Sequence, residues 1–194
     1  MEKKDAAMAK WRKTTLKLRD DHQWTGATPG YNVFVADRGA VRFNIPQDWV
    51  IIPGPDAIKF YDKQPPDDDC ILQMSLMRLN PEIDWSGLPL RQMFEATTGG
   101  DGRELTPHGE TNEIRRQNLQ IVWREYRFID ENEKREAYSR SCLARSGTLL
   151  PLITFDFWPE DAPRLEPVWQ EVLKSLRLGE YIKDPRRGAR YAYG

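Results

Sequence analysis

The fold is decided by residues 118–158, NLQIVWREYRFIDENEKREAYSRSCLARSGTLLPLITFDFW. This stretch contains three strand-like runs, at residues 119–129, 134–145 and 149–158. The first linker is four polar residues long and the second contains Gly147, so both are short enough to make consecutive strands antiparallel neighbours. We therefore predict a three-stranded antiparallel meander, a scaffold that carries no chemistry of its own.

Two further strand pairs are predicted before the meander. Residues 31–36 and 40–45 flank a three-residue turn whose last residue, Gly39, suits a left-handed backbone position. Residues 57–62 and 70–79 form the second pair, around an acidic linker that begins with two prolines. Apolar and polar residues alternate in the return strand of the first pair, so one of its sides is expected to face a core and the other, with Arg42 and Asn44, to face water.

Two segments have the periodicity of helices. In the first, Ser86 can cap a helix whose apolar stripe runs from Leu90 to Thr97. In the second, Pro167 is expected at the first helical position, a broad apolar face follows, and Gly179 ends the helix. Residues between the first helix and the meander, 103–116, fit either a ragged strand or a long crossing loop. Helices that cover sheet faces predict a layered α+β domain.

Composition indicates one globular domain whose net charge is too small to create a strong electrostatic field around the molecule. The chain has 194 residues, with seven each of Trp, Tyr and Phe to build a core. Its formal net charge is −1, so the molecule as a whole attracts neither nucleic acid nor an anionic membrane. The sequence lacks an apolar run of membrane-spanning length and an apolar segment behind its basic start, so we expect no membrane span and a cytoplasmic location.

Residue types used for metal binding and catalysis are few. Cys70 and Cys142 fall in strand-like runs, and with His22 and His108 they lack the paired spacing of a zinc site. The acidic run at residues 67–69 lacks the alternating carboxylates of a calcium loop. There is neither a G-x-S-x-G elbow nor a phosphate loop. We predict no metal, no cofactor and no catalytic residue, and a dyad of Cys142 with His108 is the hydrolase alternative that stays open.

The domain is expected to carry two distinct flanks. Residues 1–30 form a basic N-terminal arm, residues 31–179 a single domain, and residues 180–194 an Arg/Tyr-rich C-terminal tail. In the arm, residues 14–18 alternate like a strand but also fall on a helical stripe, and periodicity does not separate the two. Arginine beside tyrosine can stack on bases, yet the domain has no basic excess, so a flank docked on its own domain or on a second copy is favoured.

Two short motifs resemble a known superfamily. Residues 41–49, VRFNIPQDW, are similar to the apolar-x-Phe-x-apolar-Pro-x-x-Trp opening of the PsbP-like domains. Residues 169–178, which end in KSLRL, resemble their closing helix, and the order of elements in between also matches. The resemblance covers residues 31–179 and implies an α/β/α sandwich around a central antiparallel sheet. The chain departs from the photosystem and lipoprotein branches by lacking a targeting peptide or lipobox and by adding two flanks.

The resemblance also bears on function. PsbP-like proteins include the photosystem II accessory subunit, a Ran-binding nuclear transport factor, DcrB-type lipoproteins and chaperones of secreted toxins; they share fold and protein binding without a common catalytic motif. We therefore expect a non-enzymatic protein-interaction or accessory, chaperone-like module. The alternative is a small-ligand-binding protein or weak hydrolase with a pocket between sheet and helix.

The predicted partner-binding residues are those in which aromatic side chains and charge occur together. Both faces of residues 121–128 mix the two, and Trp, Tyr and Arg are enriched at binding hot spots. The candidates are Trp123, Arg124, Tyr126 and Arg127 in the meander, and Arg186, Arg187 and Tyr191 in the tail. The partner expected is a protein of unknown identity or, through the flanks, a second copy that makes a homodimer.

Overall fold

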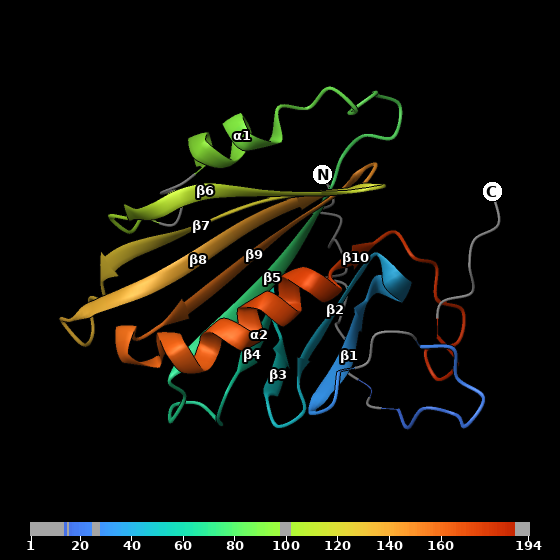
Figure 1. Cartoon of the computed structure of the whole chain (residues 1–194), viewed down its shortest axis with the longest axis horizontal. Helices are drawn as coiled ribbons and strands as arrows, with labels where there is room; N and C mark the ends of the chain where they lie inside the picture. The colour runs from blue at the N-terminus through green and yellow to red at the C-terminus, as the bar shows by residue number, and fades with distance from the viewer. Residues whose placement is uncertain (1–13, 15, 25–27, 98–101, 189–194) are drawn as a thin grey trace, which may run out of the picture.

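The computed structural model describes residues 14, 16–24, 28–97 and 102–188. In this part of the chain, two antiparallel sheets and two α-helices build an α+β fold, as the sequence predicted (Figure 1).

The larger sheet has seven strands, and the predicted meander forms its centre and one flank. In spatial order its strands are β3 (Val50–Pro53), β4 (Ile58–Tyr61), β5 (Cys70–Arg78), β9 (Leu149–Phe157), β8 (Glu136–Arg145), β7 (Leu119–Ile129) and β6 (Thr106–Arg116). All neighbours are antiparallel, and the meander strands β7, β8 and β9 pair in sequence order. Residues 103–116, for which strand and loop were both open, therefore supply the outer strand β6.

A second layer covers one face of this sheet. It contains a small sheet of β1 (Tyr31–Ala36), β2 (Val41–Pro46) and β10 (Arg177–Leu178), together with helix α2 (Ala162–Ser175). Helix and sheet are joined where the Asn44 amide donates to Ser175 Oγ at 2.8 Å. On β2, Val41, Phe43 and Ile45 are fully buried, which confirms the predicted apolar face. The expectation that the other side faces water was wrong, because Arg42 and Asn44 are buried as well and Asn44 donates to Glu171 of α2.

Helix α1 (Leu90–Thr97) lies on the opposite face of the larger sheet. Its Leu90 and Phe94 pack with Val122 and Tyr126 of β7, whereas Ile121 belongs to the core under α2. Successive strand residues point to opposite faces, so the two helices lie on opposite sides of β7. This is the α/β/α sandwich that the resemblance implied.

Trp169 of α2 lies at the centre of the main core. It is fully buried, stacks on Phe155 with ring centroids 6.0 Å apart, and meets Trp123 edge-on at 5.7 Å. The ring of Trp49 also packs against Phe155, with centroids 5.9 Å apart. Replacing a Trp packed in this way by Ala typically costs about 3–5 kcal/mol.

The predicted bounds of α2 were wrong at both ends: the helix ends at Ser175 and not at Gly179, because residues 177–178 pair with β2 as β10. The helix begins at Ala162, so Pro167 lies inside it and not at its first position. Pro167 removes one backbone hydrogen bond. The first turn is kept helical because Leu165 is 1% exposed in the main core and side chains around Arg164 anchor it. Strand β3 was also not predicted, since its four residues are too few to show a period.

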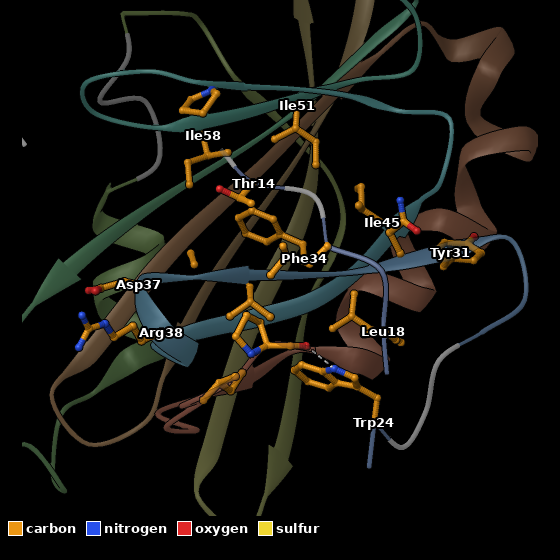
Figure 2. A pocket seen from close by; sticks show the side chains of 18 of the residues that line it. Thr14, Leu18, Trp24, Tyr31, Phe34, Asp37, Arg38, Ile45, Ile51 and Ile58 are labelled. Carbon is orange, nitrogen blue, oxygen red and sulfur yellow. Dashed lines mark hydrogen bonds between the residues drawn. The ribbon is translucent and has the colours of Figure 1, made fainter. Parts of the chain in front are cut away.

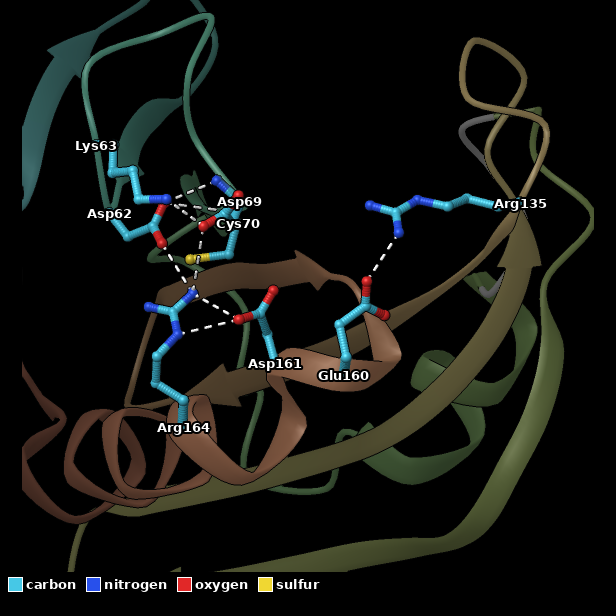
Figure 3. A network of polar contacts seen from close by, with 8 residues as sticks. All are labelled: Asp62, Lys63, Asp69, Cys70, Arg135, Glu160, Asp161 and Arg164. Carbon is cyan, nitrogen blue, oxygen red and sulfur yellow. Dashed lines mark hydrogen bonds and ion pairs between the residues drawn. The ribbon is translucent and has the colours of Figure 1, made fainter.

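Polar contacts tie the start of α2 to the loop between β4 and β5 (Figure 3). Arg164 donates to Asp161 at 3.0 Å and to Asp62 at 2.9 Å. The Asp62 side chain is 4% exposed and also accepts the backbone N–H groups of Asp69 and Cys70. The Asp69 carboxylate pairs with Lys63, and this hydrogen bond lowers its pKa. Asp62 and Asp69 of the acidic loop are thus paired with Arg164 and Lys63 of the same chain.

The C-terminal segment packs against the turn between β1 and β2. Gly179 N donates to Ala40 O at 3.1 Å, and Ile182 N donates to Arg38 O at 2.9 Å. Gly39 has a φ of +99°, and a Cβ atom there would lie 1.6 Å from the carbonyl oxygen of Glu180. Glycine is thus required at this turn both for its backbone angle and for space.

The described part of the N-terminal arm lies on the same segment. Gln23 N donates to Arg187 O at 2.6 Å, and Trp24 Nε1 donates to Pro185 O at 2.8 Å. The arm and the tail thus contact each other within one chain, one of the two arrangements that the sequence left open.

Replacing Gly39 with Ala tests this close contact, with Gly147→Ala as the matched control. Both glycines have positive φ, but a Cβ atom at Gly147 would meet nothing within 4 Å. We expect Gly147→Ala to lower the free energy of unfolding by about 1–2 kcal/mol and Gly39→Ala by about 2–4 kcal/mol, because overpacking adds to the backbone strain. Urea unfolding measures both, and equal losses would contradict the contact.

Candidate interaction surface

A bulge in β6 creates a hollow at the flank of the larger sheet. His108 of β6 is the partner of Glu125 on β7, and Asn112 is the partner of Trp123. These positions are four apart on β6 but two apart on β7, so extra β6 residues bulge outward. The hollow measures about 210 Å³ and is lined by His108, Gly109, Glu110, Asn112, Trp123 and Glu125.

A chain of ionic contacts connects this hollow to α2. Glu125 Oε1 lies 2.7 Å from His108 Nδ1, and Glu125 Oε2 accepts from Arg140 Nε at 2.8 Å. Arg140 Nη2 in turn lies 2.7 Å from Glu166 Oε2 on α2. The Arg140 side chain is only 7% exposed, so both carboxylates meet a desolvated guanidinium. The chain spans four elements: α2, β8, β7 and β6.

The contacts of His108 determine which ring nitrogen carries the proton. Arg127 Nη2 lies 2.7 Å from His108 Nε2, and a guanidinium can only donate hydrogen bonds. Nε2 must therefore accept, which leaves the proton on Nδ1, where it is donated to Glu125. These contacts favour the Nδ1–H tautomer of the neutral ring and fix its orientation.

The aromatic ring of Tyr138 packs against both His108 and Arg127. The Tyr138 ring lies 5.3 Å from the His108 ring, and the Arg127 guanidinium lies 5.6 Å from the Tyr138 centroid. The two carboxylates and two guanidiniums of the cluster balance, so it carries no net charge with His108 neutral. His108 and Trp123 remain partly exposed above this support. The result is a preorganised surface of aromatic, imidazole and guanidinium groups.

The four meander residues predicted to bind a partner lie on two opposite faces of β7. Trp123 and Arg127 share the face that bears His108. Arg124 and Tyr126 lie on the other face, where Tyr126 is 2% exposed beneath α1. Arg124 Nε donates to Gly109 O at 2.9 Å. The four side chains therefore do not form one surface, and the pair on the His108 face is the one that remains exposed together.

The tail residues lie far from the meander. Arg186 O accepts the backbone N–H of Arg19 at 3.0 Å, and Arg187 Nη2 lies 3.5 Å from Asp21 Oδ2. Figure 1 shows this segment and β7 at opposite ends of the molecule. Tyr191 lies outside the described residues. The structure thus brings the two tail arginines to the N-terminal arm and not to β7.

Sequence reasoning missed His108, Arg140 and Glu166 as parts of this surface. Arg140 interrupts an otherwise apolar strand face, which is a signal for a buried partner. Its pairing with Glu125 follows only from the register of β7 and β8, in which the two residues are direct partners. The long-range contact with Glu166 needs the helix to be placed first.

The structure does not bring Cys142 and His108 together as a catalytic dyad. Cys142 is fully buried on β8, and its burial raises the pKa of the thiol. It does not line the hollow, because β7 lies between its strand and β6. The described side chains around the hollow include no hydroxyl or thiol, and His108 Nε2 already accepts from Arg127. The space between the larger sheet and α2 is filled by core residues.

Comparison with known proteins places the chain in a family. The sequence model of Alr1449 matches residues 32–182. The chain belongs to the Alr1449 family. It is 46% identical, over 189 residues and 97% of both chains, to "Uncharacterized protein alr1449" of Nostoc sp. strain PCC 7120.

Solved structures confirm the PsbP-like fold of this Alr1449 family member. The solution structure of cyanobacterial PsbP (CyanoP) from Synechocystis sp. PCC 6803 matches with a TM-score of 0.59 and 12% identity, over 80% of this chain and 97% of that one. A protein from Bacteroides thetaiotaomicron matches with a TM-score of 0.55 and 15% identity, over 77% of this chain and 49% of its own length. At these identities the likeness concerns the fold alone.

Over residues 14, 16–24, 28–97 and 102–188, no helix combines the length and the apolar character needed to cross a bilayer. Within the same described positions, no group of three or more His, Cys, Asp or Glu side chains is arranged to hold a metal ion.

Replacing Arg140 with Met tests the ionic chain. The Glu125 carboxylate, 17% exposed, would lose its main cation, so we expect the free energy of unfolding to fall by about 2–4 kcal/mol. Adding Glu125→Gln removes the uncompensated charge and should recover part of this loss. The control, Arg91→Met, breaks an exposed pair with Glu95 and should cost less than about 1 kcal/mol. Equal costs in urea unfolding would contradict a desolvated cluster.

Proposed function

We propose that this protein is a non-enzymatic interaction module, an accessory or chaperone-like factor that binds a protein partner through its β6–β7 surface. The observation that carries the proposal is the preorganised group of Trp123, His108 and Arg127 around the hollow. Trp and Arg are the residues that dominate binding energy at interfaces, and rigid side chains lose little entropy when a partner binds.

The shape and charge of the surface support a protein partner. The hollow of about 210 Å³ can hold one partner side chain against Trp123, between His108 and Asn112. The charge of Glu125 is already paired with Arg140, so a partner need not bring a compensating ion to that carboxylate. β6 is the outer strand of the larger sheet and offers backbone groups beside the hollow.

The PsbP-like fold agrees with this function. The proteins that the sequence motifs resemble share protein binding, and none of their known roles depends on a catalytic motif common to the fold. We extend this to the present chain as an accessory role. The partner is a protein other than this chain or a second copy of it.

Domain division and location complete the proposal. We propose residues 31–179 as the domain, with residues 1–30 and 180–194 as flanks; the match of the family to residues 32–182 is close to these bounds. We also propose a cytoplasmic location, with which the free, buried thiols of Cys70 and Cys142 agree.

Filling the hollow tests the proposed surface. Asn112 is exposed and lines the hollow, so Asn112→Trp should block it without disturbing the core. We expect a protein that wild type retains from a lysate of the native host, identified by mass spectrometry, to be lost with Asn112→Trp. The matched control is Lys174→Glu on the exposed side of α2, which should retain the same protein. Equal retention by Asn112→Trp and wild type would contradict the proposed surface.

A further inference from the structure

A larger cavity lies at the other end of the molecule, along the free edge of β1. Its volume is about 740 Å³, within the range of roughly 300–1,000 Å³ that small-molecule sites occupy. Four parts of the chain enclose it: the N-terminal segment at Leu16 and Leu18, strand β1, the region around Ile51 and Ile58, and the C-terminal segment near Ile182 (Figure 2).

Apolar side chains line much of this cavity, beside polar groups. Trp24, Phe34, Ile45, Ile51 and Ile58 all line it, and Figure 2 shows them arranged around the central space. Leu16 and Tyr181, which also line it, are 43% and 59% exposed. A ligand that covered them would remove apolar surface from water that folding alone leaves exposed.

One end of the cavity carries positive charge. Arg38 and Lys183 both line it, and the hydrogen bond from Ile182 N to Arg38 O holds their backbones close together. Neither side chain forms an ion pair with any residue that the structure describes. Asp37 also lines this end, but its carboxylate is engaged by Arg78. Two exposed cations therefore remain without a counter-ion among the described groups.

The combination of an apolar chamber with a cationic end defines a chemical class of ligand. We propose that this cavity binds a single-chain anionic amphiphile, a fatty-acid carboxylate. Its alkyl chain lies among Phe34, Ile51 and Ile58, and its carboxylate is paired with Arg38 and Lys183. A neutral apolar molecule would leave the cations unused, and a compact polar anion would leave the apolar walls wet. This site is separate from the β6–β7 surface and does not depend on the function proposed for it.

Fluorescence titration of the full chain with cis-parinaric acid tests the proposal. We expect equimolar, saturable binding and displacement of the probe by dodecanoate. Methyl dodecanoate should bind at least about tenfold more weakly, because it cannot form charge-assisted hydrogen bonds with the two cations. Absence of binding would overturn the proposal, and so would equal affinities of the acid and its methyl ester.

Two kinds of variant locate the site. Ile51→Trp places bulk in the part of the cavity proposed for the alkyl chain and should weaken binding of the probe at least tenfold, whereas Gln170→Trp on the exposed side of α2 should not. The double variant Arg38→Asn, Lys183→Gln should bring the affinity for dodecanoate down to that for its ester; Asn tolerates the φ of +53° at position 38. Circular dichroism confirms that each variant is folded. Undiminished binding by Ile51→Trp would place the ligand elsewhere and overturn the proposal.

Discussion

The packing of Trp169 between Phe155 and Trp123 is the contact on which the rest of the structure depends. It fixes α2 on the larger sheet, and the end of α2 then leads directly into β10 and the small sheet. The start of the helix is fixed as well, although Pro167 removes one of its backbone hydrogen bonds. Burial of a large aromatic side chain outweighs that loss.

The position of α2 determines the ionic contacts on one side of the molecule and the segment that lines the cavity on the other. Glu166 projects from the helix to Arg140, and Arg140 holds Glu125, which orients His108 at the surface. Such a buried ionic chain adds little net stability over apolar packing, so its effect is to fix positions. At the other end of the layer, the segment after β10 encloses the cavity beside β1. The two regions thus depend on one helix but differ in chemistry: one is a balanced polar surface, the other an apolar chamber.

The sequence predicted those elements that depend on local signals. The meander followed from short polar linkers, and α1 followed from its apolar stripe at residues 90–97. Strand β3 was not predicted because its four residues, Val50–Pro53, show no alternation. They form a strand because they pair with β4. The start of α2 was misplaced because Pro163 and Pro167 give the same local signal, and tertiary burial of Leu165 decides between them.

The candidate surface was only partly predictable for the same reason. Trp123 and Arg127 stood out as aromatic and cationic residues in one strand, but their separation from Tyr126 becomes clear only when α1 covers the other face. His108 needed both the bulge in β6 and the register with β7. Contacts between residues far apart in the chain, such as Gln23 with Arg187, leave no local pattern to detect.

The protonation of His108 tests the central claim, that α2 and the sheet preorganise the β6–β7 surface, most directly. Long-range nitrogen–proton correlation spectra distinguish the two neutral tautomers of imidazole, and His22→Gln leaves His108 as the one remaining histidine signal. For the neutral imidazole we expect the proton on Nδ1 alone, and a shift toward an average of both tautomers in Arg140→Met. An Nε2–H tautomer in the otherwise unchanged protein, or an average of both forms, would contradict it.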